Sequence, residues 1–327
     1  MEKKDLIVQL NIPFRFCQSA WRRQAVSGYD PAVCAAYVQA VLTEIDAVAD
    51  ELADYQIIAV SIEGGNPSLL EAAGLQSILR ALRKRLPLAD TAQISLQTMP
   101  GEYSRALMEK MRDAGVNHWI VNLETANLNE HELLRRPYKF DALTMVDAAI
   151  RTFHPRDLSF ELLYGLPDQT AQDLDHSLDS ALAYTPEHIS LYPFAPAQGT
   201  ALYQQCRQGT LRLPTAEEAA ALRRHAHERL LALGYRPYTR FDYCLPGKEN
   251  RFRLGQLEGT EQLGLGFRAV TVMDGFSYSN GHSLQEYLEH ADDLTILANQ
   301  VVELTGDALE ALSRARAHMK PDFVVSD

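Results

Sequence analysis

The sequence predicts an α/β fold, a partial barrel of six strand–helix units followed by a smaller C-terminal α+β region. Short β-branched or apolar runs alternate with longer helical patterns over the first two thirds of the chain, which is typical of βαβ units around a parallel sheet. Six such units, each about thirty residues long, favour a barrel or partial barrel over a flat doubly wound sheet. With 327 residues, 46% of them apolar, the chain can bury a barrel-sized core and carry an appendage.

The expected strands are short and end in glycine, proline or polar residues; they cover 5–12, 56–65, 92–100, 118–125, 157–165 and 188–194. The helical stretches between them cover 31–53, 69–86, 103–115, 140–153 and 170–184. In such folds the chemistry lies at the carboxyl ends of the strands.

The pattern changes at about Gly199. A long helix is expected from Thr215, a suitable N-cap, to Gly234, a suitable stop. Strand-like segments follow at 235–245 and 262–280, and a helical tail is expected from about 283. We therefore divide the chain into a barrel, residues 1–198, and an accessory region, residues 199–327.

The formal net charge of −12 argues against binding to nucleic acid or to an anionic membrane, because either needs a basic surface. The stretch after the start "MEKKD" contains no run of eighteen apolar residues and no apolar segment of a secretory signal. We therefore expect neither a membrane span nor a secretory signal there. We expect a cytoplasmic protein that binds a small molecule, with a protein partner left open.

The four cysteines, Cys17, Cys34, Cys206 and Cys244, lack the close spacing of metal-ligand pairs. No metal site is expected from them. The simplest interpretation is that each is a small thiol in a reducing compartment.

The second expected strand ends in "EGGNPSLL". Gly64 and Gly65 permit positive φ and a close approach of a ligand to the backbone, and Asn66 precedes a proline that can begin a helix. The alternative is a tight turn without a ligand.

Polar side chains end the other strands as well, and together with Glu63 they predict a polar pocket, because a buried unpaired carboxylate costs roughly 2 to 7 kcal/mol. These residues are Gln97, Asn122, Glu124, Glu161, Ser190 and Tyr192. The three glutamates are candidates for acid–base catalysis. The simpler alternative pairs them with Arg15, Arg22 or Arg136.

Taken in order, several stretches resemble the coproporphyrinogen oxidase and haem chaperone branch, HemN and HemW, of the radical S-adenosylmethionine (SAM) family. They are "IPF", "GGNPSLL", "MRDAGVN", "LLRRPYKFDAL", "YGLPDQT", "PEHISLYPF", "GYRPY" and "LGLGFRA". The resemblance covers Leu6 to about Asn280 and implies a radical-SAM-like partial (β/α)6 TIM-type barrel. It also implies SAM or haem as cofactor or ligand, with Gly64, Gly65, Asn66, Gln97, Arg136 and Tyr192 among the binding residues.

The sequence departs from this family where the chemistry is defined. Family members carry CxxxCxxC after "IPF" for a 4Fe-4S cluster, and Arg15, Ser19 and Arg22 stand at those positions here. Cys17 is out of register, and one thiolate cannot hold a cubane cluster. No 4Fe-4S cluster is therefore expected, and a radical SAM oxidase is disfavoured.

Other family positions carry different polar groups. Glu63 and Asn66 replace a glycine and a threonine in the turn that would receive the amino acid end of SAM. Gln97, Glu124 and Glu161 replace a glutamate, a glutamine and an aspartate. In the element expected near "ENRFRL", only Asn250 matches. Because polar groups replace polar groups, we expect the pocket still to bind something polar.

Three functions remain open. The first is a cluster-free protein that binds a tetrapyrrole or SAM, with Arg15 and Arg22 on carboxylates such as porphyrin propionates. The second is a non-radical enzyme with Glu63, Glu124 or Glu161 as general base. The third is a pseudoenzyme that docks on an active relative, which predicts an exposed apolar patch. Candidate haem ligands are Cys17, His118, His188 and His282, although such histidines are more often simply packed.

Overall fold

The computed structural model describes residues 3–15, 29–102, 104–135, 150 and 157–322. One twelve-stranded sheet runs through it in the order β12-β11-β10-β9-β1-β2-β3-β4-β5-β6-β8-β7. Strands β1 to β6 are all parallel and lie next to one another in chain order. This confirms the predicted α/β class with six strand–helix units, while β12 and β7 remain the two edges of an open sheet.

The six central strands match the expected segments: β1(Lys4–Ile12), β2(Tyr55–Gly64), β3(Leu88–Thr98), β4(His118–Glu124), β5(Leu158–Tyr164) and β6(His188–Pro193). In β1, Leu6, Val8 and Leu10 belong to the large core under the helices. Ile7 lies in a separate cluster on the opposite, inner face. This alternation is the period of two that a strand requires.

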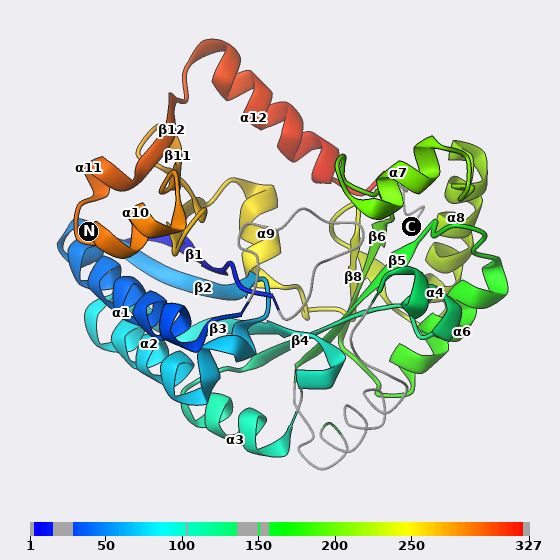
Figure 1. The fold of residues 1–327 in the computed structure, drawn as a ribbon, viewed down its shortest axis with the longest axis horizontal. Coiled ribbons are helices and arrows are strands. Elements are labelled where there is room, and N and C mark those ends of the chain that lie inside the picture. The colour runs from blue at the N-terminus through cyan, green and yellow to red at the C-terminus, as the bar shows by residue number, and fades with distance from the viewer. Residues whose placement is uncertain (1–2, 16–28, 103, 136–149, 151–156, 323–327) are drawn as a thin grey trace.

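The helices between these strands lie on the outside of the sheet (Figure 1). They are α1(Pro31–Val48), α2(Glu71–Arg85), α3(Arg105–Asp113), α4(Leu128–Leu133) and α6(Ala171–Leu182), with short 3-10 turns η1(Ala49–Leu52), η2(Pro67–Leu70) and η3(Pro100–Glu102). The helix expected at 140–153 lies outside the described residues, apart from residue 150.

Helix α1 together with η1 is long and apolar enough to cross a membrane by length and composition. One face of α1 is buried in the main core, where Tyr37, Val41 and Ile45 are fully inaccessible. Its polar Glu44 is buried as well. These contacts account for the apolar composition of α1 as that of a core helix.

The region after residue 199 extends both edges of the same sheet. Helices α7(Ala201–Arg207) and α8(Ala216–Ala232) precede β7(Arg236–Pro237) and β8(Asp242–Cys244), which add to the β6 edge. Strands β9(Glu261–Leu265), β10(Val270–Met273), β11(Phe276–Asn280) and β12(Ala298–Glu303) add to the β1 edge. Thr215 caps α8 as predicted, with a full capping box. The division at 198/199 remains a prediction.

The prediction of a helical tail from residue 283 is wrong for residues 298–303. Helices α10(Leu284–Glu289), α11(Leu294–Leu297) and α12(Gly306–Met319) are present, but 298–303 form strand β12. Its side chains are mostly exposed, so no buried pattern marked it, and pairing with β11 decides its conformation.

Two C-terminal helices reach across the open side of the sheet. Helix α9(Arg251–Glu258) lies on the inner side of the strands, whereas α12 spans the top of the molecule from β12 towards α7 (Figure 1). Phe252 of α9 is fully buried against Ile7 and Ala59. The inner face of the sheet is thus partly filled by α9.

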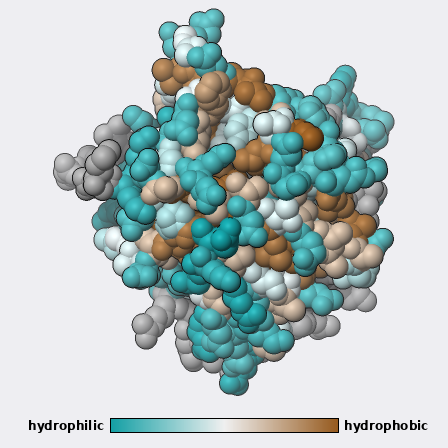
Figure 2. All heavy atoms as spheres, turned by 90° about the vertical axis from the view of Figure 1, so that its left-hand side faces the viewer, coloured by the Kyte–Doolittle hydropathy of each residue, from teal (hydrophilic) through white to brown (hydrophobic). Residues whose placement is uncertain are grey.

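The face shown in Figure 2 is largely hydrophilic, with apolar side chains in several separate groups. Exposed large apolar residues of the C-terminal region include Val301, Val302, Phe276 and Leu309.

Candidate functional site

Polar side chains line the inner face of the sheet in register. Gln9 of β1 lies opposite Ser61 of β2, which lies opposite Ser95 of β3. Further along the strands, Asn122 of β4 lies opposite Glu161 of β5, which lies opposite Ser190 of β6. Because directly paired residues share a face, each row presents its polar side chains on one face of the sheet.

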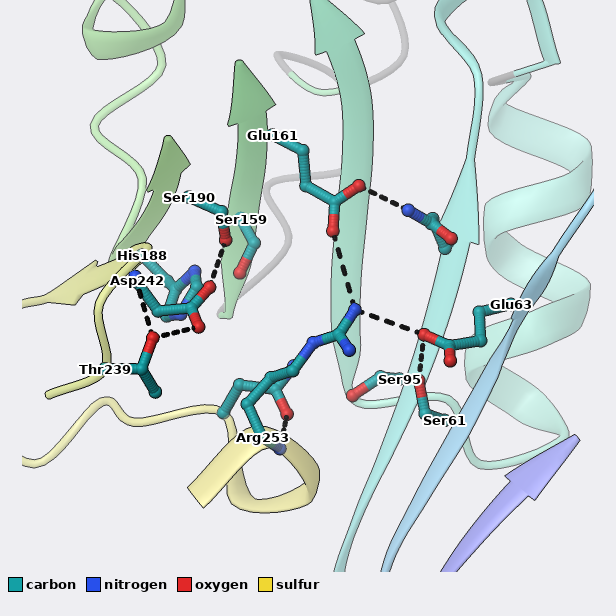
Figure 3. A network of polar contacts seen from close by, with 12 residues as sticks. Ser61, Glu63, Ser95, Ser159, Glu161, His188, Ser190, Thr239, Asp242 and Arg253 are labelled. Atoms are coloured by element: carbon teal, nitrogen blue, oxygen red, sulfur yellow. Dashed lines mark hydrogen bonds and ion pairs between the residues drawn. The ribbon is translucent and has the colours of Figure 1, made fainter. Parts of the chain in front are cut away.

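Arg253 of α9 stands at the centre of this space (Figure 3). Its Nη2 lies 3.3 Å from Glu63 Oε2 and 4.0 Å from Glu161 Oε1. Gln9 Nε2 donates to Glu63 Oε1 at 2.8 Å, and Gln97 Nε2 donates to Glu161 Oε2. The side chains of Arg253, Glu63 and Glu161 are 24%, 11% and 9% exposed. We call these three residues the barrel triad.

The sequence expected Arg15, Arg22 or Arg136 beside the glutamates, and this expectation stays a prediction. The structure adds a cation that the sequence analysis did not name: Arg253, 92 residues after Glu161, contacts both Glu63 and Glu161. The sequence did contain one indication of such a partner: several glutamates at the strand ends would need a positively charged side chain nearby if they were buried. Arg22 and Arg136 lie outside the described residues.

The turn after β2 is held by internal contacts. Gly64 has φ +106, and a Cβ there would lie 2.1 Å from Asn11 Oδ1; a Cβ on Gly65 would lie 1.9 Å from the Phe14 carbonyl oxygen. Only glycine fits such close approaches. Arg15 Nη2 donates to the Gly64 carbonyl at 2.7 Å, so a guanidinium sits at this turn.

Asn66 lies just after this turn and donates through Nδ2 to Glu102 Oε1 at 2.5 Å. Burial raises the pKa of Glu102, and hydrogen bonds from Met99 and Asn66 oppose the shift. The amide side chain of Asn66 therefore ties the turn to the end of β3.

Two further predicted residues lie near the ends of β4 and β6, and the predicted place of Glu124 in a polar pocket stays a prediction. Glu124 ends β4, is 1% exposed and has a left-handed backbone with φ 63. Burial raises the pKa of Tyr192 far above its ordinary value. Asp242 of β8, which the prediction did not include, accepts from Ser190 Oγ at 2.6 Å and from Thr239 Oγ1 at 2.5 Å (Figure 3).

Two neutral histidines begin the strands β4 and β6. His118 joins Ser95 and Ser159 at 2.8 and 2.6 Å, and His188 Nε2 lies 2.8 Å from Tyr238 OH. Burial lowers the pKa of His118 to about 3 and that of His188 to about 4. Both are packed, hydrogen-bonded side chains, and the third histidine, His282, is exposed.

The described cysteines are dispersed over the fold: Cys34 on α1, Cys206 on α7 and Cys244 on β8. Within the described residues, no group of three His, Cys, Asp or Glu side chains can hold a metal ion. Cys17 lies outside these residues.

The chain belongs to the radical SAM superfamily, whose family model matches residues 15–181. Within it, the chain is similar to the heme chaperone HemW of Synechocystis, with 30% identity over 77% of this chain and 61% of the relative. The Escherichia coli heme chaperone HemW is 26% identical over 73% of this chain and 63% of the relative. The chain thus spans less than two thirds of the length of these relatives.

The coproporphyrinogen III oxidase HemN from Escherichia coli has the same fold, with a TM-score of 0.82, 19% identity, and coverage of 98% of this chain and 76% of that chain. HemN is a radical SAM enzyme.

The superfamily implies a 4Fe-4S cluster and SAM. Among the described residues the cysteines lie on three separate elements and cannot together hold such a cluster, and the sequence lacks CxxxCxxC. SAM fits better: Arg15 at the glycine turn suits a carboxylate, and the carboxylates of the barrel triad suit a sulfonium cation.

Proposed function

We propose that this chain is a cluster-free radical-SAM-like protein that binds SAM in its polar barrel pocket without radical chemistry. The observation that carries this proposal is the separation of charge in the pocket. The Arg15 guanidinium donates to the Gly64 carbonyl at the turn after β2, and the carboxylates Glu63 and Glu161 lie beside Arg253 on the inner face of the sheet. SAM carries a carboxylate at one end of its methionine moiety and a sulfonium near the middle, so it matches this arrangement.

Within this proposal, SAM would contact the turn formed by Gly64, Gly65 and Asn66. Gln97 would orient Glu161, and Tyr192 would line the binding site. Arg22 and Arg136 are further candidates on the basis of sequence. Glu63, Glu124 and Glu161 are the candidate general bases if the pocket also carries out catalysis; Glu63 and Glu161 contact Arg253, which favours binding over proton abstraction for these two. We place the protein in the cytoplasm.

A tetrapyrrole is the second candidate ligand, and the names of the relatives favour it. Arg15 would contact a propionate at the rim. The carboxylates inside the barrel disfavour deep entry of an anionic porphyrin, so this ligand would bind at the outer face.

Two anaerobic titrations test the proposal. SAM binding is measured by calorimetry, and haem binding by the shift of its absorption band, with SAM as competitor. We expect one-to-one SAM binding that weakens roughly tenfold in Arg15→Ala. The matched control is Arg105→Ala, whose exposed guanidinium pairs with Glu109 on α3. If haem binds and SAM does not, the ligand is a tetrapyrrole and the SAM proposal is overturned. If neither ligand binds, both proposals are overturned and the pseudoenzyme is favoured.

The cluster-free part has a test of its own. After anaerobic reconstitution with iron and sulfide, we expect no absorption band from a protein-bound iron–sulfur cluster. Four irons per chain with a cubane spectrum would contradict it.

A further inference from the structure

Helix α12 joins the two edges of the open sheet. It follows directly on β12, which is one edge, and crosses the open side of the sheet towards α7 (Figure 1). At its far end the Met319 carbonyl accepts from Arg240 N at 2.6 Å, and Arg240 lies in the connection between β7 and β8 at the other edge. The helix therefore spans the gap that the open sheet leaves.

A cavity of about 290 Å³ lies between α12 and the strands beneath it. No residue of α12 is buried, so the helix covers the sheet without forming a core with it. Gln9, in the wall of the cavity, also donates to Glu63 at 2.8 Å, and the cavity thus adjoins the polar inner face. Other wall residues are Leu312, Arg316 and Met319 of α12 and Val270 and Val272 of β10.

The amide side chains beneath α12 have hydrogen-bond partners in the sheet and in α9. Gln256 Nε2 donates to Gln262 Oε1 at 2.9 Å, and Gln262 Nε2 donates to the Val270 carbonyl at 2.8 Å. Gln9 Oε1 accepts from Val270 N at 3.3 Å. Because a buried polar group is costly only when it is left unpaired, these amides remain satisfied when α12 moves away.

The two ends of α12 are attached differently. At the N-terminal end Gly306 has φ +47 with open space around it, and Thr305 forms no side-chain cap. At the C-terminal end Asp322 accepts from Arg223 Nη1 at 2.7 Å and lies 3.6 Å from Arg240 Nε. The first end is suited to a hinge, because small residues at element ends often absorb backbone rotations, and the second is held by solvent-accessible charges.

We propose that α12 is a strap, hinged at Gly306 and latched by the ion pair of Asp322 with Arg223, and that its release opens the inner face of the sheet to small molecules. The strap goes beyond the proposed function, because it controls access for any ligand of the inner face. Release removes no residue from a core, and solvent already screens the ion pair. Such weakly packed segments open locally without global unfolding.

Site-resolved thiol labelling of the full chain tests the strap without any ligand. Val272→Cys places a thiol in the cavity wall on β10, and peptide mass spectrometry measures its rate of reaction with a maleimide. We expect slow labelling that Asp322→Asn speeds about two- to fivefold, the range that a screened ion pair allows. Added salt should speed labelling while Asp322 is present and have little effect in Asp322→Asn.

Two controls separate opening of the strap from other effects. Glu310→Gln makes the same change of charge on α12, where Glu310 pairs with Arg314 on the exposed surface, and it should leave the rate unchanged. Native Cys34, buried on α1, reports global unfolding in the same sample, and its rate should be equal in all variants. Thr260→Cys, in the wall of the same cavity, is the alternative probe if Val272→Cys fails to fold.

An equal labelling rate of the cavity thiol with and without Asp322→Asn would overturn the strap. So would an acceleration that Cys34 shares, because the whole fold would then be opening. Neither result depends on SAM, whose binding is measured separately by calorimetry, so failure of the strap and failure of the proposed function are distinguishable.

Discussion

Two buried carboxylate sites join the barrel to the accessory region, and they solve the problem of a buried charge in different ways. Glu63 and Glu161 contact a guanidinium. Glu44 of α1, 1% exposed, accepts hydrogen bonds from three neutral donors among the described residues: Gly266 N at 2.8 Å, Asn280 Nδ2 at 2.5 Å and Tyr287 OH at 2.5 Å.

The Glu44 site has a consequence for pH dependence. Burial raises the pKa of Glu44 to about 7, against the opposing hydrogen bonds. The Glu44 carboxyl therefore changes charge near neutral pH, whereas Glu63 and Glu161 lie beside a guanidinium.

The largest expected effect comes from breaking the ion pairs. Arg253→Met leaves Glu63 and Glu161 buried without their cation and should lower the free energy of unfolding by about 3–5 kcal/mol. Urea denaturation followed by circular dichroism measures it. The control is Arg251→Met on the same helix, which loses a hydrogen bond to the Thr91 carbonyl and should cost about 1 kcal/mol.

A loss in Arg253→Met no greater than in Arg251→Met would show that the guanidinium does not compensate the two carboxylates. Adding Glu63→Gln and Glu161→Gln to Arg253→Met should recover most of the lost stability, because no buried charge is then left unpaired.

The next effect concerns the pH dependence of stability at Glu44. The raised pKa of Glu44 means that the folded protein binds this proton more tightly than the unfolded chain does, so the associated stability is present below about pH 4.5 and is lost as pH rises to about 7. The loss is roughly 3 kcal/mol. Glu44→Gln should remove it, which appears as the difference between the stability–pH curves of the two proteins; parallel curves from pH 4 to 8 would contradict the assignment.

A smaller effect is expected beside Glu44. The Tyr37 hydroxyl donates to the Asn11 carbonyl at 2.5 Å and accepts from Phe267 N at 3.0 Å. Tyr37→Phe leaves both backbone groups without this partner and should cost about 1–3 kcal/mol in urea denaturation. Tyr29→Phe, at a ring 42% exposed, serves as the control, and equal stabilities for the two variants would exclude a structural role for the Tyr37 hydroxyl.

The central strands were predictable because their signal is local. Apolar residues in β1 to β6 alternate or run continuously and end in turns, and a parallel sheet then places the strand ends at one edge. For this reason Glu63, Gln97 and Glu161 could be expected at the same edge, and their contacts link them through Arg253.

The electrostatic partner was not predictable in the same way. Arg253 lies 190 residues after Glu63, in a short helix with no distinctive pattern, and its role depends on how α9 packs against β1. Strand β12 was missed for a related reason, since its exposed side chains carry no core pattern and only its pairing with β11 defines it.

The smallest effect concerns a third connection, at the surface. Asp322, beyond the end of α12, pairs with Arg223 of α8, and the Met319 carbonyl accepts from Arg240 N at 2.6 Å. Helix α12 has no buried residue, so these contacts hold its C-terminal end rather than a core. The Asp322 side chain is 43% exposed, and solvent screens such a pair to about 0–1 kcal/mol.

Asp322→Asn should therefore leave global unfolding almost unchanged and instead speed amide hydrogen exchange in α12, because local opening depends on local contacts. Asp307→Asn, at the opposite end of the same helix, is the control. Faster exchange in the barrel strands as well would mean that α12 stabilises the barrel, and the surface connection would then be coupled to the two buried ones. Exchange confined to α12 would leave the buried carboxylate sites as the connections that determine the stability of the whole fold.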